Sequence, residues 1–162
     1  MLRGERIVVH GDGSSLWTIT HAEDLAVGIV GLLGNLAAIG EAFHLTSDEL
    51  LTWNAIHQAV AAAAGTQANI VHMASEDIVA AFPEYRGTLL GDKAHSAIFD
   101  NSKIRRAVPE FNPTIRFADG IRRTIAWFSA DPARRIVSPE ANAKIERLLA
   151  LHDQRRADLS QS

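Results

Sequence analysis

Three short apolar runs alternate with longer stretches of helical spacing, and this alternation most constrains how the chain can fold. The runs lie at Arg6–His10, 42–45 and Asn69–Met73, and glycines at 11, 13 and 40 mark turns beside the first two. Helices are predicted at 22–36, 52–64, 75–82, 101–107 and 119–128, and a last one begins at Ser138. We therefore predict a mostly helical chain with a few short strands.

The predicted helix at 22–36 has one apolar face, which we expect to be buried. That face consists of Leu25, Ile29, Leu32, Leu33 and Leu36, which recur at three- and four-residue steps. The glycines at 28, 31 and 34 match a loose dinucleotide-binding pattern, but such a turn must directly follow a strand. These glycines lie inside a helix, so they predict close helix packing instead.

The boundaries of the other helices follow from their end residues. Thr52 can cap a helix that Gly65 stops, and Pro83 ends the helix that begins at Ser75. The stretch 84–97 has no clear period, so we predict a loop with at most one helical turn. The last helix carries Pro139 in its first turn and is expected to fray from Arg155 onward. Its predicted buried stripe is Ala141, Ile145, Leu148 and Leu149.

Charge is distributed unevenly along the 162 residues. Residues 1–99 carry 4 basic and 11 acidic side chains, residues 100–162 carry 12 and 8, and the formal net charge is −3. Acidic residues are interspersed among the arginines of the second part, which is typical of solvated helix faces rather than of a nucleic-acid surface. A site for an anionic ligand in that part stays open as the alternative.

The sequence lacks the residues that several kinds of chemistry require. No cysteine is present, which excludes disulfides, thiolate catalysis and cysteine zinc sites. The seven histidines have neither HExxH nor HxH spacing, so no metal site is predicted. No lysine follows the only tyrosine, Tyr85, by four residues. No apolar run reaches the roughly 20 residues of a membrane span. The chain also begins without a secretion signal, so we expect a cytoplasmic protein without a membrane partner.

Three segments form a recognisable series. The first is the Gly11-Asp12-Gly13 turn followed by Trp17, His21 and Asp24-Leu25-Ala26. The second is 40–45 followed by Leu51-Thr52-Trp53. The third is Asp100-Asn101-Ser102-Lys103, then 109–113, then Gly120 and Trp127. In this order and spacing, over about residues 5–130, they resemble the C-terminal portion of the extended short-chain dehydrogenase/reductases, the NAD-dependent epimerase/dehydratase family.

The resemblance implies an α/β fold: the C-terminal portion of an extended Rossmann-type reductase, mostly helical with a few short strands and lacking the nucleotide-binding half. It implies a substrate-binding portion at 1–137 and a C-terminal helix with a frayed tail at 138–162. The family's glycine turn and its Ser/Thr, Tyr and Lys catalytic groups precede this region. No catalytic or cofactor-binding residue is therefore assigned here, and NAD or NADP is implied only for a full-length member.

Several side chains of these three segments are expected to have structural roles when they are judged by residue type and position alone. Asp24 lies near a helix start, and Asp100 can cap the short helix that carries Lys103. We expect Trp127 and Phe128 to fill the core rather than to stack on a ligand.

Two departures from the family pattern concern substrate binding. Trp17 and Leu89-Leu90 occupy positions where nucleotide-sugar epimerases have arginines that clamp pyrophosphate, and neither residue type can do so. A nucleotide-diphosphate sugar is therefore a doubtful substrate. We predict that Trp17 offers an apolar or stacking wall and that Arg86, Lys93 or His95 holds a different anion.

Three functions follow from these observations. The first is the substrate-binding part of an NAD(P)-dependent epimerase/dehydratase or reductase-like protein, inactive alone, whose partner is a missing N-terminal nucleotide-binding half or a second copy. The second is a stand-alone small-molecule-binding or regulatory module without catalysis. The third is an assembly or nucleic-acid-associated protein that uses the arginine-rich part. The substrate, the reaction and the choice between NAD and NADP stay open.

Overall fold

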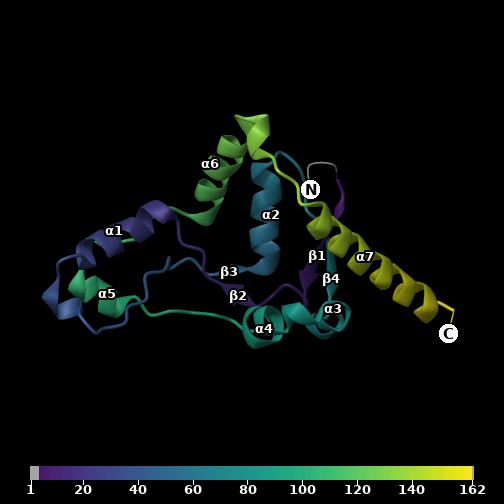
Figure 1. Cartoon of the computed structure of the whole chain (residues 1–162), viewed down its shortest axis with the longest axis horizontal. Coiled ribbons are helices and arrows are strands. Elements are labelled where there is room, and N and C mark those ends of the chain that lie inside the picture. Colours follow the sequence, from purple (N-terminus) through teal and green to yellow (C-terminus); the bar gives the residue numbers. More distant parts are fainter. Residues whose placement is uncertain (1–3, 162) are drawn as a thin grey trace.

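A two-stranded parallel sheet forms the centre of one half of the molecule. The computed structural model describes residues 4–161. Strand β1 (Arg6–His10) pairs with β4 (Asn69–Met73), from Arg6 opposite Asn69 to His10 opposite Met73. Figure 1 shows α2 (Trp53–Ala63) on one side of the strands and α7 (Pro139–Leu159) on the other. Two of the three predicted strands are thus confirmed.

The first apolar core lies beside this sheet, where α3 (Ser75–Ala81) follows β4. It consists of Met73, Ile78, Val79, Phe82, Leu89 and Leu148. A 3₁₀ turn (Pro83–Tyr85), α4 (Arg86–Thr88) and a π-type turn (Leu89–Lys93) continue the chain. The predicted loop at 84–97 is therefore wrong as far as Lys93. Leu89 is buried in this core, and this contact helps explain why the segment forms helical turns rather than an extended loop.

A short antiparallel pair leads into α2. Strand β2 (Leu16–Trp17) pairs with β3 (Leu51–Thr52). The Thr52 hydroxyl accepts a hydrogen bond from the Ala55 N–H at 3.0 Å, and Gly65 follows the helix with a φ of 71°, so both predicted ends are confirmed. Helix α6 (Phe117–Ser129) packs along α2. It contains the whole of the helix predicted at 119–128, so that prediction is also confirmed.

A second apolar core lies at the opposite end of the molecule from α7, between α1 (Ala22–Leu32) and α5 (Ser102–Ala107) (Figure 1). It consists of Ile104, Val108 and Phe111, with Leu32, Phe43, Leu45 and Ala107 packed against it. A Cβ on Gly28 would lie 2.5 Å from Leu45 Cδ2, and one on Gly31 would lie 2.3 Å from Val108 Cγ1. Gly28 and Gly31 therefore serve close packing, as the sequence predicts. The prediction is wrong for Gly34, which follows the helix and where a Cβ would meet nothing within 4 Å.

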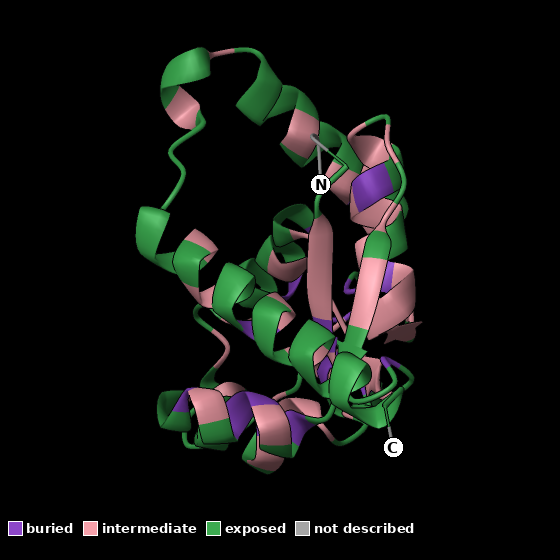
Figure 2. Ribbon diagram, turned by 90° about the vertical axis from the view of Figure 1, so that its right-hand side faces the viewer, coloured by how far each residue is buried: buried purple, intermediate pink, exposed green. Residues whose placement is uncertain are grey.

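The apolar face of α1 points outward, contrary to the prediction. Because the glycine face is turned to the second core, Leu33 and Leu36 are 72% and 81% exposed, and Ile29 is also exposed. Only Leu25 and Leu32 of the predicted face are half-buried. The helix ends at Leu32, before Gly34 with a φ of 77°, and a 3₁₀ turn (Leu36–Ala38) follows. Figure 2 shows that most of the chain is exposed or half-buried and that the buried residues are confined to small patches.

The predicted strand at 42–45 does not form. A strand requires a hydrogen-bonded neighbour, and none of the residues from 4 to 161 supplies one to this segment. The side chain of Asn101 binds the chain just beyond it. Its Oδ1 accepts from the Thr46 N–H at 3.2 Å, and its Nδ2 donates to the Thr46 carbonyl at 2.8 Å. Asn101 thus takes the place that a neighbouring strand would have at this residue.

Helix α7 extends to Leu159, and the fraying expected from Arg155 onward stays a prediction. Of its predicted stripe, Leu148 is buried and Leu149 half-buried, whereas Ala141 and Ile145 are exposed. Ion pairs supplement this small apolar contact: Asp153 with Arg6 at 2.7 Å, Lys144 with Glu84 at 3.0 Å, and Arg155 with Asp77. Within residues 4–161 no helix combines the length and the apolar character that crossing a membrane requires.

Candidate functional site

The turn after β1 is fastened to the first turn of α2. Gly11 and Gly13 have φ values of 58° and 72°, which glycine adopts without strain. The Asn54 N–H donates to the Gly13 carbonyl at 3.1 Å, and its Nδ2 donates to the Asp12 carbonyl at 2.9 Å. A Cβ on Gly13 would lie 2.2 Å from Asn54 Oδ1. This close fit brings the end of β1 and the start of β2 against α2.

Four side chains gather at this junction: His10, Trp17, Trp53 and Lys93, here called the Trp17 cluster. The rings of Trp17 and Trp53 have centroids 5.6 Å apart and are tilted by 34°. His10 meets Trp53 edge-on at 5.2 Å, and Lys93 Nζ lies 5.4 Å from the centroid of the Trp17 ring. An aromatic surface beside an ammonium group suits a ligand with an apolar ring face and an anionic group.

The interior of the cluster contains unpaired polar atoms. His10 Nε2 and Trp53 Nε1 are buried and have no hydrogen-bond partner within the described chain. Burial lowers the pKa of His10, and the nearby His57 and Lys93 lower it further. Burial also lowers the pKa of His57. Both imidazoles therefore favour the neutral form, which can accept a hydrogen bond as well as donate one.

Two of the four predicted ligand residues, Trp17 and Lys93, lie together. The Ser15 hydroxyl donates to the Lys93 carbonyl at 2.8 Å, and the Ala97 N–H donates to the Leu16 carbonyl at 2.9 Å, so the segment after the π-type turn runs beside β2.

The other two predicted residues lie outside the Trp17 cluster. His95 is exposed, with its Nε2 3.1 Å from the Leu90 carbonyl oxygen. Arg86 is exposed on α4 and has no ion pair within residues 4–161. Their role as ligand residues stays a prediction.

The sequence interpretation missed His10, Trp53 and His57. A signal was present, because Trp53 and His57 are four residues apart and therefore share a face of the helix predicted at 52–64. His10 ends a predicted strand next to a glycine turn. What the sequence does not show is that the β2–β3 pairing brings Trp17 onto the same face.

The carboxylates in the resembling segments have structural roles. Asp24 is buried and accepts from the Ile115 N–H at 2.9 Å and the Thr114 N–H at 3.3 Å. Asp100 accepts from the Ser102 N–H at 2.8 Å, and the hydrogen bonds from Ser102 lower the pKa of Asp100. Asp100 thus has the expected structural role at the start of α5, although the N-cap residue itself is Asn101.

Other residues of those segments also hold the chain together or face solvent. Lys103 pairs with Glu41 at 2.6 Å. His21 packs on Gly120, where a Cβ would lie 2.8 Å from His21 Cδ2. Trp127 and Phe128 are exposed rather than buried in the core, so that expectation is wrong.

No cluster of metal-ligating side chains occurs among the residues that the structure describes. No protein-family model matches the sequence, and no curated protein matches it significantly.

The fold is similar to part of the fold of solved nucleotide-sugar epimerases and dehydratases. Among the similar solved structures, UDP-glucuronic acid 4-epimerase from Bacillus cereus, in complex with UDP-glucuronic acid and NAD, has a TM-score of 0.62 at 19% identity. The match covers 80% of this chain and 37% of the epimerase. dTDP-glucose 4,6-dehydratase from Streptomyces venezuelae, with NAD bound, has a TM-score of 0.59 at 22% identity, over 82% of this chain and 36% of the dehydratase.

A dTDP-glucose 4,6-dehydratase from Bacillus anthracis gives the same result, with a TM-score of 0.60 at 17% identity. The chain thus spans little more than a third of the length of these enzymes. The expected fold class, a mostly helical portion of such a fold with a few short strands, is confirmed.

Proposed function

We propose that this chain is the substrate-binding part of an NAD(P)-dependent epimerase-, dehydratase- or reductase-like protein, and that it has no catalytic activity alone. One observation carries the proposal: in a chain with part of this fold, the outward face of α1 is apolar and exposed beside an unpaired segment. Large exposed apolar surfaces and unpaired edges normally mark places where another element packs.

The proposed occupant of this surface is a nucleotide-binding portion, carried by further residues of the polypeptide or by a separate chain. An apolar cavity of about 430 Å³ lies between α1 and the segment at 41–45, and its lining includes Leu33, Leu36, Ile39 and Phe43. A strand placed beside 42–45 would supply the missing hydrogen bonds and cover these side chains. A second copy of the chain is the competing occupant.

The Trp17 cluster is the proposed contact with substrate. Lys93 would bind an anionic group, and the face of Trp17 would pack on a ring. Because Trp17 stands where a pyrophosphate-clamping arginine is expected, the favoured ligand is a sugar monophosphate or sugar acid rather than a nucleotide-diphosphate sugar. NAD or NADP would bind the other portion, and the absence of cysteine agrees with a cytoplasmic setting.

The first test is the DNA upstream of Met1. An in-frame Gly-x-x-Gly-x-x-Gly turn and a Tyr-x-x-x-Lys pair, or a neighbouring gene that encodes them, is the expected result. The purified 162-residue chain should neither bind NAD(P)H nor turn it over. Turnover by this chain alone would contradict the proposal.

A stand-alone binding module is the second candidate, and the preassembled Trp17 cluster with its unpaired His10 Nε2 favours it. Both candidates predict binding of glucose 6-phosphate, followed by tryptophan fluorescence. Trp17→Ala should weaken this binding about tenfold, because the stacking surface and the ring contact that positions Lys93 are lost together. Trp127→Ala, on the exposed face of α6, is the matched control. A genuine stop codon upstream, with binding and no partner, would favour the module.

A further inference from the structure

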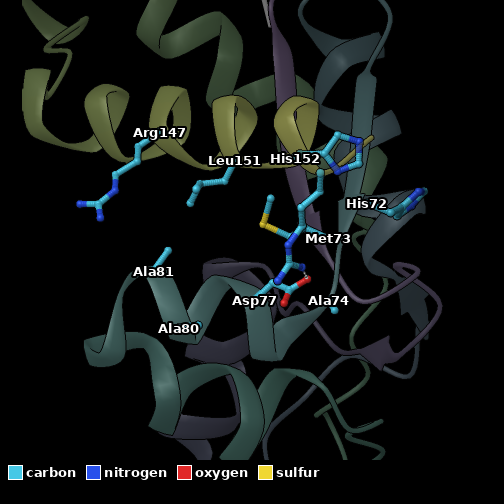
Figure 3. Close-up of a pocket in the computed structure, with 10 residues that line it drawn as sticks. His72, Met73, Ala74, Asp77, Ala80, Ala81, Arg147, Leu151 and His152 are labelled. Carbon is cyan, nitrogen blue, oxygen red and sulfur yellow. Dashed lines mark hydrogen bonds and ion pairs between the residues drawn. The ribbon is translucent and has the colours of Figure 1, made fainter. Parts of the chain in front are cut away.

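A cavity that the proposed function does not use lies where α3 meets α7. It has a volume of about 370 Å³, within the range of small-molecule sites. Figure 3 shows Leu151 and His152 projecting from α7 on one side, Asp77 and Ala80 from α3 on the other, and Met73 between them. The Trp17 cluster contributes no residue to this cavity.

One face of α7 supplies positive charge to the cavity. Arg147, Leu151 and Arg155 follow one another at four-residue steps, and His152 lies next to them. Arg155 pairs with Asp77 through Nη1, and its other guanidinium donors make no further hydrogen bond or ion pair within residues 4–161. The His152 ring has no hydrogen bond within residues 4–161. The cavity thus holds unused donors on an otherwise acidic protein.

The rest of the lining is apolar. Met73 is buried, and Ala80, Ala81 and Leu151 complete this part of the wall. At the far end Arg147 lies over the ring of Phe82, 5.3 Å from its centroid, and has no acidic partner in the described chain. The cavity therefore has a basic end, an apolar middle and a second cation beyond it.

Two of these basic groups, Arg147 and His152, form no ion pair that fastens α7 to the molecule. The Arg6–Asp153 and Lys144–Glu84 ion pairs join α7 to β1 and to the turn after α3, on either side of the cavity, and Leu148 fills the first core. Arg147 and His152 lie between these contacts and form no ion pair within residues 4–161. The hydrogen bond from Arg6 lowers the pKa of Asp153, and His152 helps to lower it. Binding of a ligand explains their position better than helix docking does.

We propose that this cavity is a binding site for a small organic anion, a carboxylate or a phosphate monoester with a short apolar body. Arg155 and His152 hold the anionic group, and the apolar body lies against Met73 and Leu151. Asp77 competes with the ligand for Arg155, so the ion pair opens when the ligand binds. The site is independent of the proposed substrate surface.

The test uses phenyl phosphate and benzoate as probes on the 162-residue chain, with amide chemical shifts and calorimetry as readouts. Either probe should shift the amides of 72–81 and 147–155, and the tighter of the two identifies the anionic group. Arg155→Gln should weaken binding about tenfold. Asp77→Asn should strengthen it severalfold, because the competing carboxylate is gone.

The opposite signs of these two substitutions separate a ligand site from a merely structural ion pair. If the pair only fastened α7, both variants would bind the probes equally or less well. Arg156→Gln, next in sequence but outside the cavity lining, is the control and should leave affinity unchanged. The proposal fails if neither probe shifts these amides at about 10 mM, if Asp77→Asn weakens binding, or if Arg156→Gln weakens it as much as Arg155→Gln.

Discussion

Asn101→Ala tests how the unpaired segment is held in place. Asn101 is 2% exposed, and its amide makes four hydrogen bonds: two with the Thr46 backbone, one with the Thr46 hydroxyl and one with Asp48 Oδ1. Alanine removes all four and leaves two backbone groups unpaired. At about 1 kcal/mol per bond, reduced where water reaches Asp48, the loss is about 3 kcal/mol. For a chain of this length it lowers Tm by about 6–12 °C.

The assay is urea unfolding followed by circular dichroism, with Tm as a second measure. Asn142→Ala, on the helical segment of α7, is the matched control and should be within about 0.5 kcal/mol of the parent protein. Asn101→Asp keeps the acceptors but loses both donations and places a second carboxylate beside Asp48. Its defect should therefore shrink as pH falls and one carboxyl becomes protonated. The reasoning is refuted if Asn101→Ala costs less than about 0.5 kcal/mol.

Three further predictions rest on other parts of the molecule. Gly31→Ala should lower the unfolding free energy by about 1–2 kcal/mol, measured in urea, because contact with buried Val108 outweighs better helix propensity. Burial lowers the pKa of His10 and His57, so the unfolded chain binds more protons just below pH 6.5, and stability should fall as pH drops through that window. Ring-proton NMR midpoints at or above 6.5 would contradict this. Leu36→Lys should reduce self-association of the isolated chain in sedimentation velocity, and an unchanged profile would count against the exposed face as its cause.

Local signals were sufficient to predict much of the fold. The strands at Arg6–His10 and Asn69–Met73 have the predicted bounds, and Thr52 and Gly65 end α2 as expected. Each of these features depends on residues close in sequence, such as a cap, a glycine of positive φ or a short apolar run.

The failures involve residues that are distant in sequence. The segment at 42–45 is apolar enough for a strand but has no neighbour to pair with. The leucine face of α1 points outward because the glycine face fits Val108 and Leu45 more closely. Periodicity identifies an apolar face but not the surface it packs against.

In the candidate site, too, the local features could be predicted and the contacts between distant residues could not. Trp17 and Lys93 were predicted from the resemblance, as an apolar wall and an anion-binding group where the family's arginines are missing, and the structure brings them together. The contact of Trp17 with Trp53, and the partial burial of His10 and His57 nearby, depend on the β2–β3 pairing and on the turn held by Asn54. Neither contact is visible in the linear sequence.

The two apolar cores have no residue in common, and this separation bears on how the molecule opens. The core around Ile104 and Phe111 is small, and few contacts join α1 to the sheet end of the protein. Local unfolding there would leave β1, β4 and α7 in place, so amide exchange should be fast at one end and slow at the other. The α1 end would then be a separate cooperative unit, free to reorder around whatever packs on it while the end that carries the anion cavity keeps its shape.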